Sequence, residues 1–372
     1  MPVVDSPLAP VLALKSKQGE IDAVLRTDLG TEAPVISVEL LNSLKVDSRI
    51  TTKIVRMGVA AVRAGRSLWL DTTWLSPSSP FGSIPGGAFE HLDAKIEAEL
   101  DEKRERNLLN AHVPALIPVI APTVDDRELR RVRLLREHNP REIALRCRHA
   151  SRGGNPRLVD RIARVARATG ASSREIHLLL DEGYVDRVDE RRVHELLGVI
   201  NDVAENCELA SIGLLAGSTP KKRNGYETHF RDRAEVDLWR AVQQSCQHRI
   251  RYGDYGVVHP VPGDDDGIGW ANPYIHYTVP NRTLFIARKI PGRGTGAPPP
   301  GTSEQYFLEV ADELVNHSEF AGADFSWGDQ TLHECRHLAK PEVGRSTKWI
   351  AIATSHHMAH ISRTGASTGV HR

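Results

Sequence analysis

Short apolar runs alternate with longer, more polar stretches through the first 256 residues. The run VLALK (11–15) is almost entirely apolar, which is typical of a strand buried on both faces. The stretch at 155–170 instead repeats apolar residues every three to four positions, which predicts an amphipathic helix. This alternation occurs eight times. We therefore expect strands at residues 11–15, 35–40, 68–72, 115–120, 142–147, 175–180, 208–214 and 249–254.

Strands that alternate with helices form parallel sheets, because parallel neighbours need a helical crossover. Eight such units predict that residues 8–256 close into an α/β barrel of the (β/α)8 TIM type. The alternative is an open doubly wound sheet. That alternative is weaker because no G-x-G-x-x-G follows the first strand.

The pattern changes after residue 256, and we treat 257–372 as an extension packed on the barrel. Two β-rich runs flank a Pro-Asn turn at 274–289, which predicts a hairpin. Residues 303–317 form an amphipathic pattern that we interpret as the late eighth helix of the barrel. Residues 346–363 predict one further helix packed outside it.

Composition excludes some classes of protein without selecting one. The 48 basic and 48 acidic residues cancel, so there is no global charge signal for nucleic acid, although a local basic patch stays open. The apolar runs are far shorter than a membrane span requires. The start of the sequence lacks the pattern of a signal peptide, and the four cysteines are scattered. We expect a cytoplasmic protein that does not contact a membrane.

The stretch HECRH (333–337) matches the zinc-protease helix pattern H-E-x-x-H. His333 and His337 would be zinc ligands and Glu334 the base, but a zinc site also needs a third ligand. Neither of the expected downstream spacings supplies one. A metalloprotease therefore stays a remote alternative, and we expect no metal at these histidines.

The ends of the predicted strands carry ionisable residues, and barrel enzymes place their catalytic groups at that end of the barrel. We expect a catalytic role for these residues, which are Lys15, Glu39, Asp71, Arg146, Asp181 and Asp254. Four carboxylates with two cations could hold a divalent metal ion, or could supply acid and base beside an anion clamp. The alternative is a salt-bridged plug that closes the top of the barrel.

Two further segments add candidates for ligand binding. The loop after the seventh strand is a Gly-flanked basic turn, and such loops commonly bind phosphate in these barrels. Its candidate residues are Ser218, Thr219, Lys221, Lys222 and Arg223. In YGDYG (252–256), Tyr252 and Tyr255 flank Asp254 and could stack on a base or a sugar.

Five short motifs together resemble the beta protein family, which occurs in phages, prophages and bacterial genomes. They are PVLALKSKQGEIDAV near the start, RYGDYGVVHP at 251–260, NPYIHYT at 272–278, FSWGD at 325–329 and STKWIAIATSHHMAHI at 346–361. The resemblance covers residues 8–361. It implies functional roles for Trp349, His356 and His357 and a phage-related or defence-related context, but it supplies no mechanism.

The preferred function is an enzyme that acts on a phosphate-bearing ligand, a nucleotide or nucleic acid, at the mouth of the barrel. The alternative is a non-catalytic recognition or scaffold protein in phage–host conflict. Its protein partner would bind a face formed by His356, His357 and the predicted hairpin.

Overall fold

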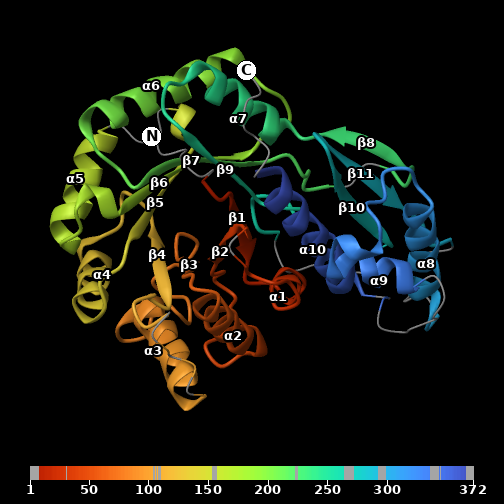
Figure 1. Cartoon of the computed structure of the whole chain (residues 1–372), viewed down its shortest axis with the longest axis horizontal. Helices are drawn as coiled ribbons and strands as arrows, with labels where there is room; N and C mark the ends of the chain where they lie inside the picture. The colour runs from red at the N-terminus through yellow and green to blue at the C-terminus, as the bar shows by residue number, and fades with distance from the viewer. Residues whose placement is uncertain are drawn as a thin grey trace.

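The computed structural model of the chain describes residues 8–30, 32–103, 105, 107, 110–152, 157–222, 225–263, 272–291, 299–335, 343 and 345–365. Figure 1 shows a barrel with a ring of helices and a smaller unit on one side, which we call the C-terminal unit. Among the helices in these ranges, none combines the length and the apolar character that a membrane span requires.

Eight parallel strands close the barrel in the order β1-β2-β3-β4-β5-β6-β7-β9, which confirms the predicted (β/α)8 fold. The strands are β1 (Val11–Lys15), β2 (Val35–Glu39), β3 (Leu68–Asp71), β4 (Leu116–Ile120), β5 (Ile143–Arg148), β6 (Ile176–Tyr184), β7 (Ser211–Gly217) and β9 (Ile250–Asp254). The outer helices are α1 (Gln18–Val24), α2 (Arg49–Arg63), α3 (Gly87–Glu102), α4 (Asp126–His138), α5 (Leu158–Thr169), α6 (Glu190–Asn206) and α7 (Ala234–Ser245). Short 3-10 turns η1 (Ala150–Arg152) and η2 (Ser173–Glu175) precede α5 and β6.

Successive residues of each strand face opposite sides of the barrel wall. Outward residues such as Leu12 and Leu14 join one large apolar core with the helices. Inward residues such as Val11, Ala144 and Leu179 belong to a separate small core inside the barrel. At the C-terminal ends of the strands the inward positions become polar, so the barrel interior ends in a layer of ionisable side chains.

A three-stranded antiparallel sheet lies beside the barrel, with strand order β10-β11-β8. Strands β10 (Tyr274–Val279) and β11 (Arg282–Ala287) are the predicted hairpin, with Asn281 in the left-handed backbone region at its turn. Strand β8 (His229–Asp232) comes from the chain between β7 and α7 and pairs with β11. The segment 229–232 therefore leaves the barrel and contributes an edge strand to the C-terminal unit.

Three more helices complete the described chain, namely α8 (Thr302–Val315), α9 (Trp327–Cys335) and α10 (Ser346–Gly365), with a 3-10 turn η3 (Ala323–Phe325) before α9. We had interpreted 303–317 as the eighth barrel helix, but α8 packs in the core of the C-terminal unit through Phe307 and Leu314. Helix α10 instead takes that position, because its Met358 and Ile361 join the core that surrounds the barrel. Figure 1 shows α10 between the barrel strands and the small sheet, beside α1.

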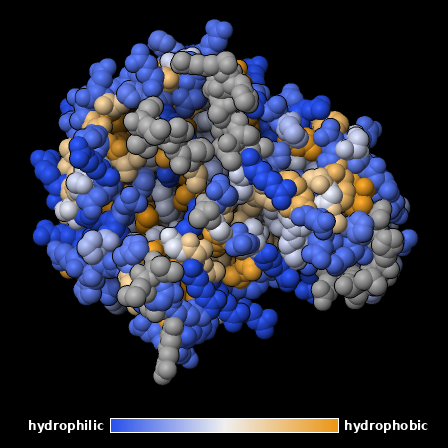
Figure 2. Space-filling model, viewed as in Figure 1, coloured by the Kyte–Doolittle hydropathy of each residue, from blue (hydrophilic) through white to orange (hydrophobic). Residues whose placement is uncertain are grey.

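The C-terminal unit has its own apolar core, and α10 belongs to both cores. Trp349 of α10 is fully buried and stacks on Phe307 of α8, with 5.0 Å between ring centroids. In the view of Figure 2 the surface of the molecule is mostly hydrophilic, with apolar areas between the barrel helices and over the C-terminal unit.

The close approach of α10 to α1 predicts the effect of a single added methyl group. A Cβ atom at Gly19 would lie 2.6 Å from the backbone oxygen of Thr347, so Gly19→Ala must push the two helices apart. We expect it to destabilise the protein by about 1–3 kcal/mol, as overpacking does. The matched control Gly198→Ala lies in α6 with no atom near its Cβ, and it should be neutral or stabilising by up to about 1 kcal/mol. Thermal melts measure both changes. Equal melting temperatures for the two variants would contradict this packing.

Candidate functional site at the barrel mouth

Arg146 of β5 lies at the centre of the barrel mouth, fully surrounded by acceptors. Its Nε donates to Asp181 Oδ2 at 2.9 Å. Its Nη1 donates to both Glu39 Oε1 and Asp71 Oδ2, and its Nη2 donates to the hydroxyl of Tyr255. One guanidinium thus cross-links β2, β3, β6 and the end of β9. We call Lys15, Glu39, Asp71, Arg146, Asp181 and Tyr255 the mouth cluster; all six are buried.

Local backbone and side-chain donors fix each carboxylate of the mouth cluster. The backbone N–H of Thr73 donates to Asp71 Oδ1 at 2.7 Å, just after β3 ends. Asp181 Oδ1 accepts from the backbone of Gly183 at 2.9 Å and from Tyr255 at 2.6 Å. These donors hold the two carboxylates in fixed orientations.

Lys15 differs from the rest of the cluster because its charge is poorly satisfied. Its ammonium Nζ lies 3.5 Å from Glu39 Oε2, and the side chain is only 4% exposed. Within the described residues, neither this Nζ nor Glu39 Oε2 has a hydrogen-bond partner. The ammonium also lies 5.2 Å from the centre of the Tyr255 ring. A buried cation without a hydrogen-bond acceptor is unusual and calls for an explanation, such as a ligand or a water molecule.

Two carboxyl groups next to Lys15 have pKa values displaced in opposite directions. Burial alone would raise the pKa of Glu39, but the charges of Arg146 and Lys15 outweigh it and lower that pKa to about 2. Glu20 of α1 accepts the backbone N–H of Lys15 at 3.0 Å, and burial raises its pKa to about 7. At neutral pH the site therefore holds an ionised carboxylate and a carboxyl group that retains a proton for part of the time.

The sequence indicated that these carboxylates could hold a divalent metal ion. In the structure the guanidinium of Arg146 occupies the position between Glu39, Asp71 and Asp181 that a cation would take. No group of three or more His, Cys, Asp or Glu side chains in the described ranges is arranged to hold a metal. Each of these carboxylates is thus already paired with the same cation of the protein.

The predicted zinc motif is only partly described. His333 and Glu334 lie on α9, whereas His337 falls outside the described residues. Two histidines further along the chain, His356 and His357, each contact a carboxylate oxygen and a second polar atom.

Asp254 does not join the mouth cluster, although we expected all six strand-end residues to converge. It lies on the outer side of β9, where Oδ2 accepts from Arg233 at 2.9 Å and from Tyr252 at 2.6 Å. Its Oδ1 contacts Nε2 of His357 at 3.0 Å and accepts from the backbone of Gly256 at 2.9 Å. Burial would raise its pKa, but His357 and Arg233 hold the pKa of Asp254 well below the usual range.

A second aspartate–histidine pair lies one residue further back on α10. The nitrogen Nδ1 of His356 lies 2.9 Å from Asp329 Oδ2, and Nε2 lies 2.7 Å from the carbonyl oxygen of Thr278. Both ring nitrogens therefore lie within hydrogen-bond distance of an oxygen atom. Tyr277 stacks on the imidazole at 3.7 Å between centroids and donates to Asp329 Oδ1 at 2.7 Å. The adjacent residues His356 and His357 thus join α10 to the small sheet, α9 and the barrel wall.

This burial corrects the hypothesis of an exposed protein-binding face. Trp349, His356 and His357 are each only 1% exposed, so they cannot line the surface of the C-terminal unit. Tyr252 is partly buried, and its ring packs edge-on against Trp239 of α7 outside the barrel wall. Of the two tyrosines in YGDYG, only Tyr255 reaches the mouth.

The loop after β7 begins at the C-terminal end of that strand, on the side of the barrel that carries the mouth. Ser218 and Thr219 are buried, Lys221 and Lys222 are exposed, and Arg223 lies outside the described residues. The hydroxyl of Thr219 accepts from Nη2 of Arg231 at 3.3 Å.

His259, which follows β9, connects this loop to the mouth. It stacks on Tyr184 with 5.3 Å between ring centroids. Burial lowers the pKa of His259, and the charges of Lys15 and Lys221 lower it further. The charges of both lysines therefore lower the pKa of the same imidazole.

Sequence reasoning missed three side chains near the mouth. Glu20 follows Lys15 by five residues, and its nearness required knowing how α1 folds back over β1. Trp74 donates from its indole to Glu39 Oε1 at 2.9 Å. Arg148 stacks on Trp74 at 3.6 Å and donates to Thr73 Oγ1 at 3.0 Å. The sequence offered one signal for two of them, since Trp74 and Arg148 follow the ends of predicted strands and could therefore lie at the mouth.

The fold and the mouth cluster define a (β/α)8 barrel protein whose polar mouth is built around one arginine. The chain matches the family described as Beta protein over residues 9–363, which is nearly its whole length, and it belongs to that family. No curated protein matches the chain.

The raised pKa of Glu20 predicts a pH dependence of stability. A carboxyl group whose folded pKa exceeds its unfolded value stabilises the fold below about pH 4.5, and that contribution is lost as pH rises through about 7. We expect the wild type to lose roughly 3 kcal/mol from this group between pH 5 and 9. Glu20→Gln keeps the acceptor for Lys15 N–H without a charge, so its stability should be flatter over this range. Urea unfolding at several pH values measures the difference, and parallel curves for the two proteins would contradict it.

The contacts of Asp254 predict a structural role. Asp254→Asn removes the charge opposite Arg233 and His357, while Arg233 keeps its ion pair with Glu235. We expect a cost of about 1–3 kcal/mol, as weakening of buried hydrogen bonds to charged groups predicts. The matched control Asp324→Asn changes an exposed carboxylate and should leave the melting temperature unchanged. If Asp254→Asn melted like the wild type, this network would not hold α10 on the barrel.

Proposed function

We propose that the chain is an enzyme that binds a phosphate-bearing ligand, a nucleotide or the end of a nucleic acid, at the mouth of its barrel. The observation that carries the proposal is the environment of Lys15. Its buried ammonium has no hydrogen-bond acceptor among the described residues, and two carboxyl groups with opposite pKa displacements lie beside it. Pairs of titratable groups whose pKa values are driven apart are typical of acid and base partners.

The residues of the mouth have distinct roles in this proposal. Lys15 would donate to a phosphate oxygen, with the hydroxyl groups and lysines of the loop after β7 on the same side. Glu39 would act as the ionised base, and Glu20 would exchange a proton near neutral pH. Arg146 would be a positioning residue, because all its contacts hold carboxylates and Tyr255 in place.

Family membership suggests a phage-associated protein. Phage proteins and the host systems that oppose them commonly meet at nucleic acid, so a nucleotide or a nucleic-acid end is a suitable ligand for this context. A role in antiviral defence and a cytoplasmic location are part of the same proposal.

A second candidate is a non-catalytic recognition or scaffold protein, and one observation favours it. Arg146 already forms ion pairs with all three mouth carboxylates, as in the salt-bridged plug that the sequence left open. In this case the partner would bind the small sheet, where β8 is an edge strand and Phe230 is 38% exposed. Sheet edges with exposed apolar residues can accept a strand from another protein.

Lys15→Gln tests the enzyme proposal most directly. Arg146 still compensates Glu39 in this variant, so we expect the fold to survive with a melting temperature close to that of the wild type. The experiment incubates each protein with nucleoside mono-, di- and triphosphates and with short 5′-phosphorylated oligonucleotides, and follows them by phosphorus NMR. We expect the wild type to convert at least one compound and Lys15→Gln to lose at least tenfold in rate, as loss of a charge-assisted hydrogen bond predicts. The control Lys103→Gln changes an exposed lysine just after the end of α3 and should retain full activity.

Glu39→Gln separates binding from chemistry in the same assay. If Glu39 is the base, this variant should bind the compound but not convert it. A wild type that neither binds nor converts any compound of the panel would contradict the proposal and would favour the scaffold.

A further inference from the structure

A polar groove of about 420 Å3 lies between α1 and the C-terminal unit, and none of its described lining residues belongs to the mouth cluster. Three residues of α1 and the turn after it line one wall at four-residue spacing, namely Gln18, Asp22 and Arg26. The opposite wall consists of Trp327 from α9 and of Arg345, Thr347, Lys348 and Ala351 at the start of α10. We call this the α1–α10 groove. Its volume falls in the range of small-molecule sites.

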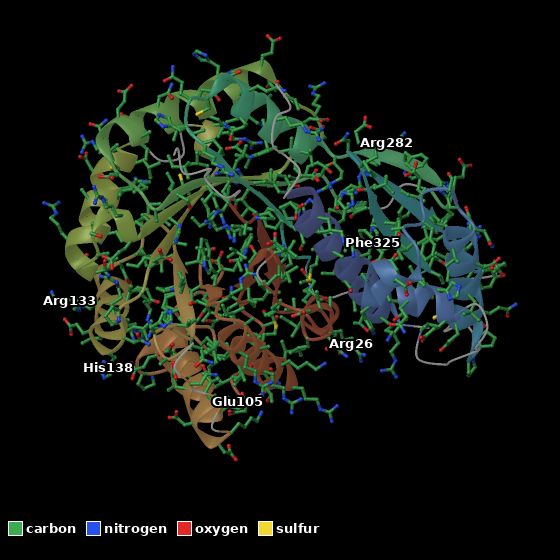
Figure 3. All side chains as sticks on the ribbon, viewed as in Figure 1. Arg26, Glu105, Arg133, His138, Arg282 and Phe325 are labelled. Carbon is green, nitrogen blue, oxygen red and sulfur yellow. The ribbon has the colours of Figure 1, made fainter. Side chains whose placement is uncertain are left out.

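The charges that line the groove are predominantly positive. Arg26, Arg345 and Lys348 face it from both walls. Its one carboxylate among the described lining residues is Asp22, which already forms an ion pair with Lys53 of α2. In the part of the chain that the structure describes, Arg26 and Arg345 have no carboxylate within ion-pair distance, although Arg26 is exposed at the rim. Figure 3 shows Arg26 between α1 and the helices of the C-terminal unit.

Trp327 holds two of these cations in fixed positions. The guanidinium of Arg26 lies 4.7 Å from the centre of its ring, and the ammonium of Lys348 also lies 4.7 Å from it. The ring attracts each positive charge electrostatically and so holds the cation near its face. The indole therefore preorganises two cations that converge on one groove.

The start of α10 adds to the same potential. The groove lies at the first turn of this 20-residue helix, where the helix dipole favours an anion, although the N–H groups of Lys348 and Trp349 already donate to the carbonyl of Arg345. Thr347 contributes a hydroxyl group from that turn. Cations, a hydroxyl group and a helix N-terminus around a cavity of this size are the components of a site for phosphate groups.

We propose that the α1–α10 groove is a second ligand site, which binds a phosphate-bearing small anion through Arg26, Arg345, Lys348 and Thr347. The site is independent of the proposed chemistry at the mouth. Inorganic phosphates and nucleotides share the chemistry that it recognises, so both serve as probes.

Isothermal titration calorimetry of the full chain with pyrophosphate, and separately with adenosine monophosphate, tests the proposal. We expect binding of at least one probe, and a loss of roughly tenfold or more in affinity for Arg26→Gln, as removal of a charge-assisted hydrogen bond predicts. Tighter binding of adenosine monophosphate would indicate a nucleotide ligand, whereas tighter binding of pyrophosphate would indicate that the phosphate groups suffice. Because Arg26 is exposed, the variant should keep the melting temperature of the wild type.

Arg363→Gln is the matched control. Arg363 also stacks on an aromatic ring of the C-terminal unit, Phe325 at 3.8 Å, but lies at the other end of α10. Its substitution should leave both affinities unchanged. Absence of binding by the wild type, or equal binding by Arg26→Gln, would overturn the proposal. Binding that is lost in Lys15→Gln and kept in Arg26→Gln would also overturn it, while supporting a ligand at the mouth.

Discussion

The barrel depends on one buried guanidinium. Arg146 donates to oxygen atoms from four strand ends at once, so one side chain holds most of the polar layer at the top of the barrel together. Burying three carboxylates together would otherwise be prohibitive, because each loses its hydration and repels the others. The planar fork of arginine is the one side chain that can donate to several acceptors in a fixed geometry. The positions of Glu39, Asp71 and Asp181 follow from it.

A second set of buried polar contacts lies outside the barrel wall. The neighbouring histidines of α10 contact two aspartates, one on β9 and one on α9. Because consecutive residues of a helix point about 100° apart, His356 and His357 can reach partners in different units. Apolar packing around Trp349 and Met358 buries α10 between the two cores. The two histidine–aspartate pairs fix its rotation about the helix axis and its position along that axis.

Strand positions and barrel closure were predictable, because eight apolar runs separated by amphipathic helices leave few alternatives. The gathering of Lys15, Glu39, Asp71, Arg146 and Asp181 followed from that frame. The predicted position of Asp254 at the mouth was wrong, because YGDY has no alternation of apolar and polar residues that would show which side faces inward. In the structure the inward positions are Gly253 and Tyr255.

The C-terminal unit was harder to predict. The order of helices along the chain favoured residues 303–317 as the eighth barrel helix, and only packing shows that α10 takes that position. Strand β8 was missed because HFRD is short and polar, as edge strands often are. The α1–α10 groove depends on side chains from three helices that are far apart in sequence, so no local pattern could indicate it.

The position of α10 has a consequence for synthesis on the ribosome. Strand β9 ends at Asp254, but the helix that covers its outer face begins at Ser346. During translation the last strand of the barrel is therefore complete long before its cover exists, and the apolar wall of β9 and β1 stays open to solvent in the interval. Strand β8 likewise lacks its pairing partner until β11 has been synthesised. The nascent chain thus exposes the outer faces of β9 and β1 until α10 docks. A chaperone that binds this intermediate would bind at the junction of the barrel and the C-terminal unit.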